Sequence, residues 1–487
     1  MSFRAILFFV SVMVPVVCAN AQSQVYSAKS GGEVLRLIRN DKLDLILPGA
    51  MRDNNVDMWI HVTRAGDVDP LSQQFGSTSG YLIFTDLGDR IERVAFGRNG
   101  AVENIDIRGS TALTRAITGY DFEKVGFSVY DEIAEFVAER DPATIAVNTS
   151  VHLSEADGIS YSQYLKLEKI LGPKYSSRII SAENVITDFL VRRTLREVTA
   201  QTNALEIARQ IVMDGLARVT PGVTTSGELA WWVREESYRR GLTGYTTDIS
   251  GYPRIYYSAV NTPDKTVEDA PPDVRFFFRN PDYVLQRGDF FSMGGTGIDY
   301  MGFGIDTKIH AYILREGETR VPASLQKTFD LAIAGQWIMR EHMKVGMTAR
   351  ESLSAMVAAM EDEGYIYTPF VDSGALTPDG KSTADYAMVQ RALARTDKPG
   401  FSIDHHSFGN NPSGLSPAGP SVADFRQDML DLTIQENHLF AYEYMVHMNI
   451  PERPGYPLCI NISNPQIVSS RGIEFIQPPN EKIVLIN

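Results

Sequence analysis

Apolar positions in the first third of the chain fall into short runs separated by segments with helical spacing. The runs Asp57–Val62, Tyr81–Phe84 and Thr144–Asn148 are dominated by β-branched, aromatic and other apolar residues, which predicts buried strands. Val34–Ile38 has the spacing of a short helix that precedes them. Strands that alternate with helices favour a mixed sheet covered by helices, so we predict that residues 28–185 form a first α/β domain.

Helical spacing dominates the start of the second part. Apolar residues in Val198–Leu216 recur at helical intervals, and Pro221-Gly222 follows as a stop signal. Thr225-Ser226-Gly227-Glu228 then has the capping-box pattern that opens a new helix. The same order recurs later, where a helical pattern over Leu325–Ile338 is followed by a second capping box, Thr348-Ala349-Arg350-Glu351.

This recurrence predicts an internal duplication in a second domain, residues 186–487. Gly222-Val223-Thr224 and Gly346-Met347-Thr348 stand 124 residues apart in matching contexts. The period is too long, and occurs too few times, for a solenoid. A helix–Gly–Thr–helix unit used twice therefore indicates two related halves around a shared site, while two unrelated helical hairpins are the alternative.

The N-terminus has the pattern of a cleaved export signal. Arg4 supplies a short positive region, and Ile6–Val17 is an apolar run of twelve residues, too short to span a bilayer. Ala19-Asn20-Ala21 gives a small-x-small cleavage pattern. We therefore expect residues 1–21 to be removed and the mature protein to be secreted or periplasmic.

Charge and cysteine content narrow the function classes further. The net charge of -14 argues against binding to nucleic acid and to anionic membrane surfaces. No segment after the signal reaches eighteen uninterrupted apolar residues, so we expect no membrane attachment after cleavage. Cys459 is the only cysteine left once Cys18 is removed, which leaves stability to the apolar core.

Several local phrases resemble one superfamily. These phrases are Leu47-Pro48-x-x-Met51-Arg52-x-x-x-Val56-Asp57-Met58-Trp59-Ile60, Arg287-Gly288-Asp289 and Tyr300-Met301-Gly302-Phe303-Gly304-Ile305-Asp306. With the internal duplication, they resemble the creatinase, aminopeptidase P and methionine aminopeptidase superfamily, and above all secreted bacterial Xaa-Pro aminopeptidase-like proteins. The resemblance implies a creatinase-like N-terminal α/β domain, a pseudo-symmetric pita-bread domain, a peptide or small amidic substrate, and a homodimer.

The resemblance also implies a metal site. Its chemistry needs two Asp, one His and two Glu, which hold two divalent metals that activate a water and polarise a carbonyl. Asp306 matches the second Asp, and Glu443 matches the first Glu. His406 matches a His phrase, with His405 beside it; if the ligand instead belongs to a second cluster, it falls on residues 411–413, which contain no imidazole.

Two ligand positions depart from the family pattern. The first Asp is expected eleven residues before Asp306, where Gly295 stands, and the last Glu is expected nine residues before Gly472, where Ser463 stands. A carboxylate one residue away would face the other side of a strand and would not replace a ligand. We therefore predict either no cofactor or a single divalent metal on Asp306, His406 and Glu443, and a degraded two-metal site.

The sequence leaves three functional classes open for this exported aminopeptidase-like chain. The first is a non-catalytic pseudoenzyme that binds peptides or small amidic ligands. The second is a metal-independent, creatinase-like C–N hydrolase in which His405, His406 and Glu443 carry the proton transfers. The third is an active metallopeptidase whose missing ligands are displaced, for example to Asp404 or Asp299.

Overall fold

The computed structural model describes residues 28–63, 69–76, 78–98, 102–118, 126–244, 252–258, 279–294, 298–300, 303–369, 389, 392–407 and 418–487. The predicted signal segment 1–21, Gly295 and residues 411–413 lie outside these ranges, as does the side chain of Asp299. Among the described helices, none combines the length and the apolar character needed to cross a bilayer.

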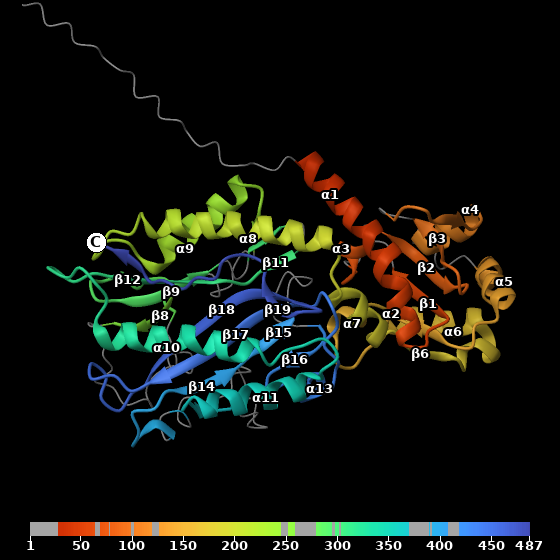
Figure 1. Cartoon of the computed structure of the whole chain (residues 1–487). Helices are drawn as coiled ribbons and strands as arrows, with labels where there is room; N and C mark the ends of the chain where they lie inside the picture. The colour runs from red at the N-terminus through yellow and green to blue at the C-terminus, as the bar shows by residue number, and fades with distance from the viewer. Residues whose placement is uncertain are drawn as a thin grey trace, which may run out of the picture.

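A six-stranded mixed sheet organises the N-terminal part, on the right of Figure 1. Its order is β4-β3-β2-β1-β5-β6, with β1 antiparallel to β2 and parallel to β5. The strands are β1 (Met58–Thr63), β2 (Ser79–Asp86), β3 (Ile91–Arg98), β4 (Asp106–Arg108), β5 (Ile145–Val147) and β6 (Ile179–Ser181). The three predicted strands are confirmed as β1, β2 and β5.

Helices cover both faces of this sheet. They are α2 (Leu47–Asp53), α3 (Ser72–Phe75), α4 (Thr111–Thr118), α5 (Asp131–Arg140), α6 (Tyr161–Ser176) and α7 (Glu183–Val191). The first helix, α1 (Ala28–Asp41), instead packs through Ile38 in an apolar cluster of the C-terminal part. Alternate residues of β1 point to opposite faces, so that Trp59 packs in one apolar cluster with α2 and α7, and Ile60 packs in another with α4, α5 and α6. The sheet is therefore a central layer between two cores.

Four long helices shape the C-terminal part. They are α8 (Leu195–Leu216), α9 (Ser226–Arg239), α10 (Ala323–Arg340) and α11 (Ala349–Asp362). Both predicted capping boxes are present, because the Thr225 and Thr348 side chains accept bonds from the backbone N–H of Glu228 and Glu351. The pattern-based assignment of these helices is confirmed.

The two helix pairs are joined in the same way. The backbone N–H of Gly222 donates to Leu285 O at 2.8 Å, and that of Gly346 donates to Ile434 O at 2.9 Å. Both glycines have positive φ, 76° and 89°, a conformation that Gly adopts without a Cβ clash. Matching turns and matching backbone pairings support two related halves rather than two unrelated hairpins.

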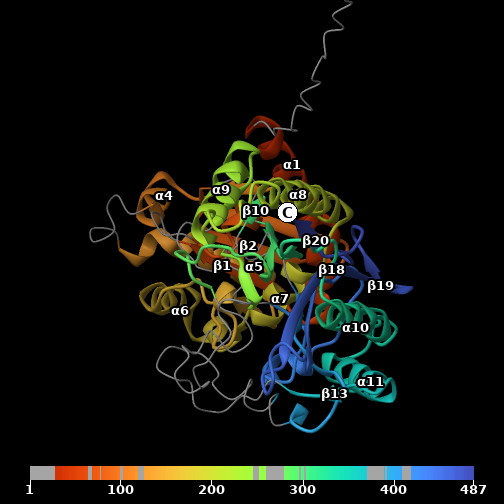
Figure 2. The same ribbon diagram turned by 90° about the vertical axis from the view of Figure 1, so that its left-hand side faces the viewer.

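Each helix pair packs on its own sheet. The first sheet has the order β20-β12-β9-β8 and the second contains β13-β14-β17-β15-β16, with β18 and β19 added beside β17. A third, three-stranded sheet joins β11, β10 and β7. In Figures 1 and 2 the pair α8–α9 lies above the pair α10–α11, and α10 packs against β17 and β18.

The bounds of the remaining elements complete the architecture. The first and third sheets comprise β7 (Thr243–Gly244), β8 (Arg254–Tyr257), β9 (Phe290–Gly294), β10 (Ile298–Tyr300), β11 (Phe303–Ile305), β12 (Lys308–Ile313) and β20 (Val484–Ile486). The second comprises β13 (Ile366–Tyr367), β14 (Gly400–Ile403), β15 (His405–Ser407), β16 (Ser421–Val422), β17 (Leu439–Met448), β18 (Leu458–Ser469) and β19 (Gly472–Phe475), with the short helix α13 (Gln427–Leu430) nearby.

The two sheets meet where β12 approaches β18. The ring Nε2 of His310, on β12, lies 3.0 Å from the backbone O of Asn461, on β18. Burial lowers the pKa of His310 to about 3, so the ring is neutral and donates this bond. The contact brings the end of the first half beside the central strands of the second, and the candidate site lies at this junction.

Candidate functional site

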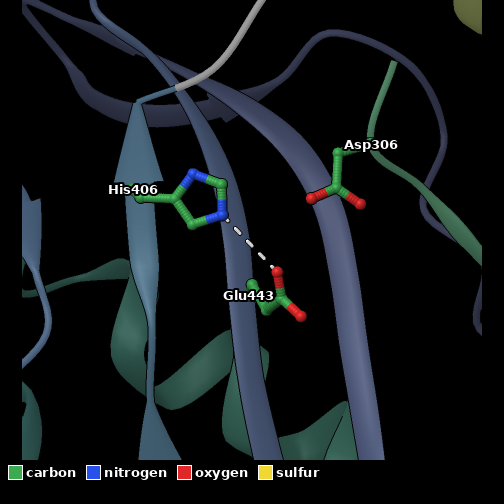
Figure 3. A group of neighbouring side chains, drawn as sticks. All are labelled: Asp306, His406 and Glu443. Atoms are coloured by element: carbon green, nitrogen blue, oxygen red, sulfur yellow. Dashed lines mark ion pairs between the residues drawn. The ribbon is translucent and has the colours of Figure 1, made fainter. Parts of the chain in front are cut away.

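Three of the residues singled out in the sequence converge at the junction of the two sheets. Asp306 lies between β11 and β12, His406 is on β15 and Glu443 is on β17. One possible ligand atom from each lies within 4.8 Å of the others. Figure 3 shows the three side chains pointing toward one another, His406 and Glu443 from two strands and Asp306 from the segment between β11 and β12. Only the tertiary fold brings them together, since 137 residues separate Asp306 from Glu443.

The register of β15 and β17 explains why His406 faces Glu443. Ile403 pairs with Tyr444 and His406 pairs with Ala441, so the same register sets Asp404 opposite Glu443. Side chains alternate along a strand, which puts Asp404 and His406 on one face. The backbone N–H of Asp404 donates to the backbone O of Glu443 at 2.9 Å, which fixes this register at the site.

His405, which the predicted catalytic set also included, lies on the opposite face of β15 from His406. Its ring stacks on Tyr442 with centroids 3.7 Å apart, and its Nδ1 lies 2.8 Å from the backbone O of Glu443. Burial lowers the pKa of His405 to about 3, so the ring stays neutral. The reason is the two-residue period of the strand, which turns adjacent histidines away from each other.

Lys308 enters the site and was missed in the sequence. Its Nζ lies 3.3 Å from Asp306 Oδ1 and 3.0 Å from Glu443 Oε1, and its side chain is only 2% exposed. Lys308 is two residues after Asp306, so both point to the same side of an extended segment. A lysine at the start of a buried strand was the available signal, because lysine is almost never fully buried unless it is paired.

Several cationic and polar side chains contact Glu443. Besides Lys308, its Oε1 accepts a bond from Asn461 Nδ2 at 2.8 Å and lies 3.7 Å from a guanidinium nitrogen of Arg254. Arg254 also donates to Asn461 Oδ1 at 2.9 Å. Burial acts to raise the pKa of Glu443, but Lys308, His406 and Arg254 outweigh it and hold that pKa well below its usual range. Glu443 is therefore ionised.

His406 is bonded at both ring nitrogens. Its Nε2 lies 3.5 Å from Glu443 Oε2, and its Nδ1 lies 3.1 Å from the backbone O of Ser407. Burial acts to lower the pKa of His406, but the contact with Glu443 and the charge of Asp404 raise it overall. This geometry suits an imidazolium that donates both of its N–H groups.

Asp404 supplies the nearby carboxylate that the displaced-ligand alternative requires, but it has a partner of its own. A guanidinium nitrogen of Arg426 lies 2.9 Å from Asp404 Oδ1. Burial raises the pKa of Asp404 against the opposing charges of Arg426 and His406. Asp404 thus forms an ion pair at the edge of the site and is not one of the three converging residues.

Ser463 lies where the sequence comparison expected the last glutamate. In the pairing of β17 with β18 it is directly opposite Glu443, so the strand frame around this position is intact. The side chain is buried, and the described part of the chain offers its Oγ no hydrogen-bond partner. A hydroxyl therefore faces the site in place of a bridging carboxylate.

Among the described residues, the donor atoms at this junction do not make up a two-metal centre. Asp306, His406 and Glu443 have the donor atoms for one divalent metal, but the ammonium of Lys308 already lies between the two carboxylates. At an effective dielectric constant of about 20, a divalent ion about 4 Å from that ammonium is repelled by about 8 kcal/mol. The carboxylates of Asp306 and Glu443 would attract the ion, but they already share the ammonium of Lys308, and Ser463 adds no further negative charge.

Comparison with known proteins reveals the fold. No protein-family model matches the sequence, and no curated protein matches it. Among solved structures, an X-Pro aminopeptidase from Thermotoga maritima aligns over 90% of this chain and 100% of its own, with 14% identity and a TM-score of 0.55. A dipeptidase, PepE, from Mycobacterium ulcerans aligns over 95% and 99%, with 13% identity and a TM-score of 0.52.

An Xaa-Pro dipeptidase from Bacillus anthracis aligns over 94% of this chain and all of its own, with 15% identity and a TM-score of 0.50. At these identities the likeness concerns the fold alone. The chain has the two-part α/β, pita-bread fold of Xaa-Pro aminopeptidases and dipeptidases, as the sequence resemblance predicted.

Proposed function

We propose that this chain is a metal-independent protein of the Xaa-Pro aminopeptidase fold that binds a peptide or small amidic ligand at Asp306, His406 and Glu443. The observation that carries the proposal is the Lys308 ammonium, 3.0 Å from Glu443 and 3.3 Å from Asp306. It supplies positive charge where the fold's metallopeptidase chemistry would need a metal ion. Arg254 and Asn461 complete the neutralisation of Glu443 from the other side.

Metal content and peptidase activity test this proposal together. Purified protein should contain well below one equivalent of divalent metal by elemental analysis. Incubation with Mn²⁺ or Zn²⁺ should not produce cleavage of an Xaa-Pro peptide. Two bound equivalents together with metal-dependent cleavage would contradict the proposal and favour the displaced-ligand metallopeptidase.

Hydrolysis without metal is the second candidate function, and the pair His406–Glu443 favours it. His406 Nε2 is close enough to Glu443 Oε2, at 3.5 Å, to be oriented by it. In this reaction Glu443 accepts a proton from water as the water oxygen bonds to the amide carbon, and the imidazolium of His406 gives a proton to the leaving nitrogen as the C–N bond breaks. Glu443 then passes its proton to His406, which restores both groups. The ammonium of Lys308 would stabilise negative charge on the carbonyl oxygen.

Neighbouring histidines provide a matched test of this second function. Turnover of a panel of Xaa-Pro amides should persist in excess EDTA and disappear in His406→Asn. His405→Asn, on the other face of the same strand, should retain turnover and lower only the stability. Loss of turnover in EDTA, or equal rates in wild type and His406→Asn, would contradict hydrolysis without metal. Ligand binding would then be the only one of the two proposed functions that remains.

We further propose that the mature protein is exported. The support is the pattern of Arg4, the apolar run Ile6–Val17 and the small residues before Gln22. Expression of the full chain in a bacterial host, followed by N-terminal sequencing of the periplasmic fraction, should give Gln22 as the first residue. A cytoplasmic protein that retains Met1 or Ser2 would refute export.

A further inference from the structure

We infer that Lys308 and Ser463 together bind one oxygen atom of the ligand, an amide carbonyl oxygen, beside Glu443. The inference rests on the proposed function and specifies which atom of a peptide or amide the site recognises. It also gives Ser463, which stands where the fold's metal chemistry needs a carboxylate, a role of its own.

The first observation is the unsatisfied hydroxyl of Ser463. The residue is 1% exposed, and no hydrogen-bond partner for its Oγ lies among the described residues. Leaving a buried hydroxyl unpaired costs about 1–3 kcal/mol, and most such groups in native proteins are bonded. A ligand atom that bonds to this hydroxyl would remove that cost.

The second observation is that Lys308 and Ser463 flank the same carboxylate. Lys308 Nζ lies 3.0 Å from Glu443 Oε1, and Ser463 is the cross-strand partner of Glu443. Directly opposite residues in an antiparallel pair have Cβ atoms about 5 Å apart. Both side chains therefore approach Glu443, one from β12 and one from β18.

Two contacts between the sheets set Lys308 level with Ser463. His310 Nε2 bonds to the backbone O of Asn461 at 3.0 Å, and Asn480 ties the backbone O of Lys308 to the side chain of Asn464, at 3.0 and 3.1 Å. His310 is therefore next to Asn461, and Lys308, two residues earlier on β12, is tied to Asn464, three residues later than Asn461 on β18. Ser463 lies between the two tie points.

The donors and charges select a neutral oxygen. The ammonium of Lys308 and the hydroxyl of Ser463 can both donate hydrogen bonds to a ligand oxygen. Within the described ranges, Lys308 contacts two acceptors, Asp306 and Glu443. Its third N–H is left for a ligand. The carboxylates of Asp306 and Glu443 lie 3.3 and 3.0 Å from Lys308 Nζ. A ligand carboxylate beside Lys308 would be repelled by both of them, which favours a neutral carbonyl oxygen.

The test compares two probes that differ only at the amide bond. Alanyl-prolinamide carries the carbonyl oxygen, and its alkene isostere has a carbon–carbon double bond in place of the amide bond, so this analogue lacks the oxygen and adds no basic nitrogen. By calorimetric titration, wild type should bind alanyl-prolinamide more tightly than the alkene analogue. Ser463→Ala should weaken binding of alanyl-prolinamide about fivefold, the effect of one neutral hydrogen bond, and should not change binding of the analogue.

Two further variants make the result specific. Lys308→Met should weaken alanyl-prolinamide binding at least tenfold, because its hydrogen bond is charge-assisted. Ser226→Ala is the matched control, since Ser226 on α9 is also fully buried and its hydroxyl has no partner within the described ranges. This control should bind both probes like wild type.

Three results would overturn the inference: no binding of either probe by wild type, equal binding of both, or wild-type affinity in Ser463→Ala. A failure of the proposed function would give a different result. Wild type and Ser463→Ala would then both contain two equivalents of metal and would both cleave an Xaa-Pro peptide in a metal-dependent way. Circular dichroism of each variant identifies loss of folding. A folded Ser463→Thr variant keeps the hydroxyl, so it should bind alanyl-prolinamide more tightly than Ser463→Ala does.

Discussion

The ammonium of Lys308 lies 3.0 Å from Oε1 of Glu443, although the two residues are on different sheets of the fold. Both side chains are largely buried, 2% and 14% exposed. A buried charge pair of this kind is strongly destabilised when one partner is removed, because the other charge remains in a poorly solvated position. The pair therefore links the two sheets and places a positive charge beside the carboxylates of the site.

Removing the ammonium should create a site for a single metal ion. We expect Lys308→Ala to be less stable than wild type by about 3–5 kcal/mol, because Asp306 and Glu443 lose their shared cation. Zn²⁺ or Mn²⁺ should then raise its thermal unfolding temperature, since a ligand at about 100 times its Kd adds about 2.7 kcal/mol.

The controls for this variant are wild type and the double variant Lys308→Ala/Asp306→Asn. Neither should show the metal-dependent rise in unfolding temperature by differential scanning calorimetry. An equal rise in wild type would mean that Lys308 does not exclude metal from the site.

The buried ion cluster between the two parts of the chain should be essential for stability. Lys42 Nζ lies 3.5 Å from Glu197 Oε2 and donates to the backbone O of Arg192 at 2.6 Å, while Arg193 lies 3.6 Å from Glu197 Oε1. All three charged side chains are at most 1% exposed. Lys42→Met should cost about 3–5 kcal/mol, because Glu197 keeps only one cation.

A double-mutant cycle checks that this cost comes from the pair. The free energies of unfolding of Lys42→Met, Glu197→Gln and the double variant are measured by chemical denaturation. The double variant should lose less stability than the two single losses added together. Additive losses would mean that the two side chains do not interact energetically.

Acid should destabilise the fold through His447. Its ring is buried and lies 2.9 Å from Ser402 Oγ, and burial lowers its pKa from 6.5 to about 3. Between these values the unfolded chain binds a proton at His447 and the folded chain does not, so stability falls as the pH falls. From pH 7.5 to 4.5 this one group should remove about 2–3 kcal/mol from the free energy of unfolding.

His447→Gln isolates that contribution, because an amide can bond to Ser402 and does not titrate. Urea titrations at each pH give the free energy of unfolding of wild type and of His447→Gln. The difference between the two free energies should become smaller by about 2–3 kcal/mol from pH 7.5 to 4.5. A difference independent of pH would place the acid sensitivity elsewhere.

The two capping boxes should contribute equally and independently. The Thr225 hydroxyl accepts from the N–H of Glu228 at 3.0 Å, and the Thr348 hydroxyl accepts from that of Glu351 at 3.2 Å. Thr225→Ala and Thr348→Ala should each cost about 1 kcal/mol, and the double variant about twice that, because the helices begin far apart. Serine at either position should restore stability; a large loss from only one alanine variant would argue against equivalent halves.

The sequence by itself determined the local structure and most of the architecture. The strands around Trp59 and Ile83, the four long helices and both capping boxes follow from residue periodicity and from side chains that bond to their own backbone. Asp306, His406 and Glu443 could also be predicted, because each stands in a local phrase that resembles a known family.

The tertiary structure alone decided what surrounds these three residues. Lys308 and Arg254 lie far from Glu443 in the sequence, and no local pattern shows that their charges meet at one carboxylate oxygen. The strand register likewise decided that His406 faces the site while His405 is buried behind it. The charges around Glu443 and the face on which each histidine lies both depend on how strands from two sheets are placed in space. The sequence therefore predicted the carboxylates Asp306 and Glu443, and the fold placed the cation Lys308 between them.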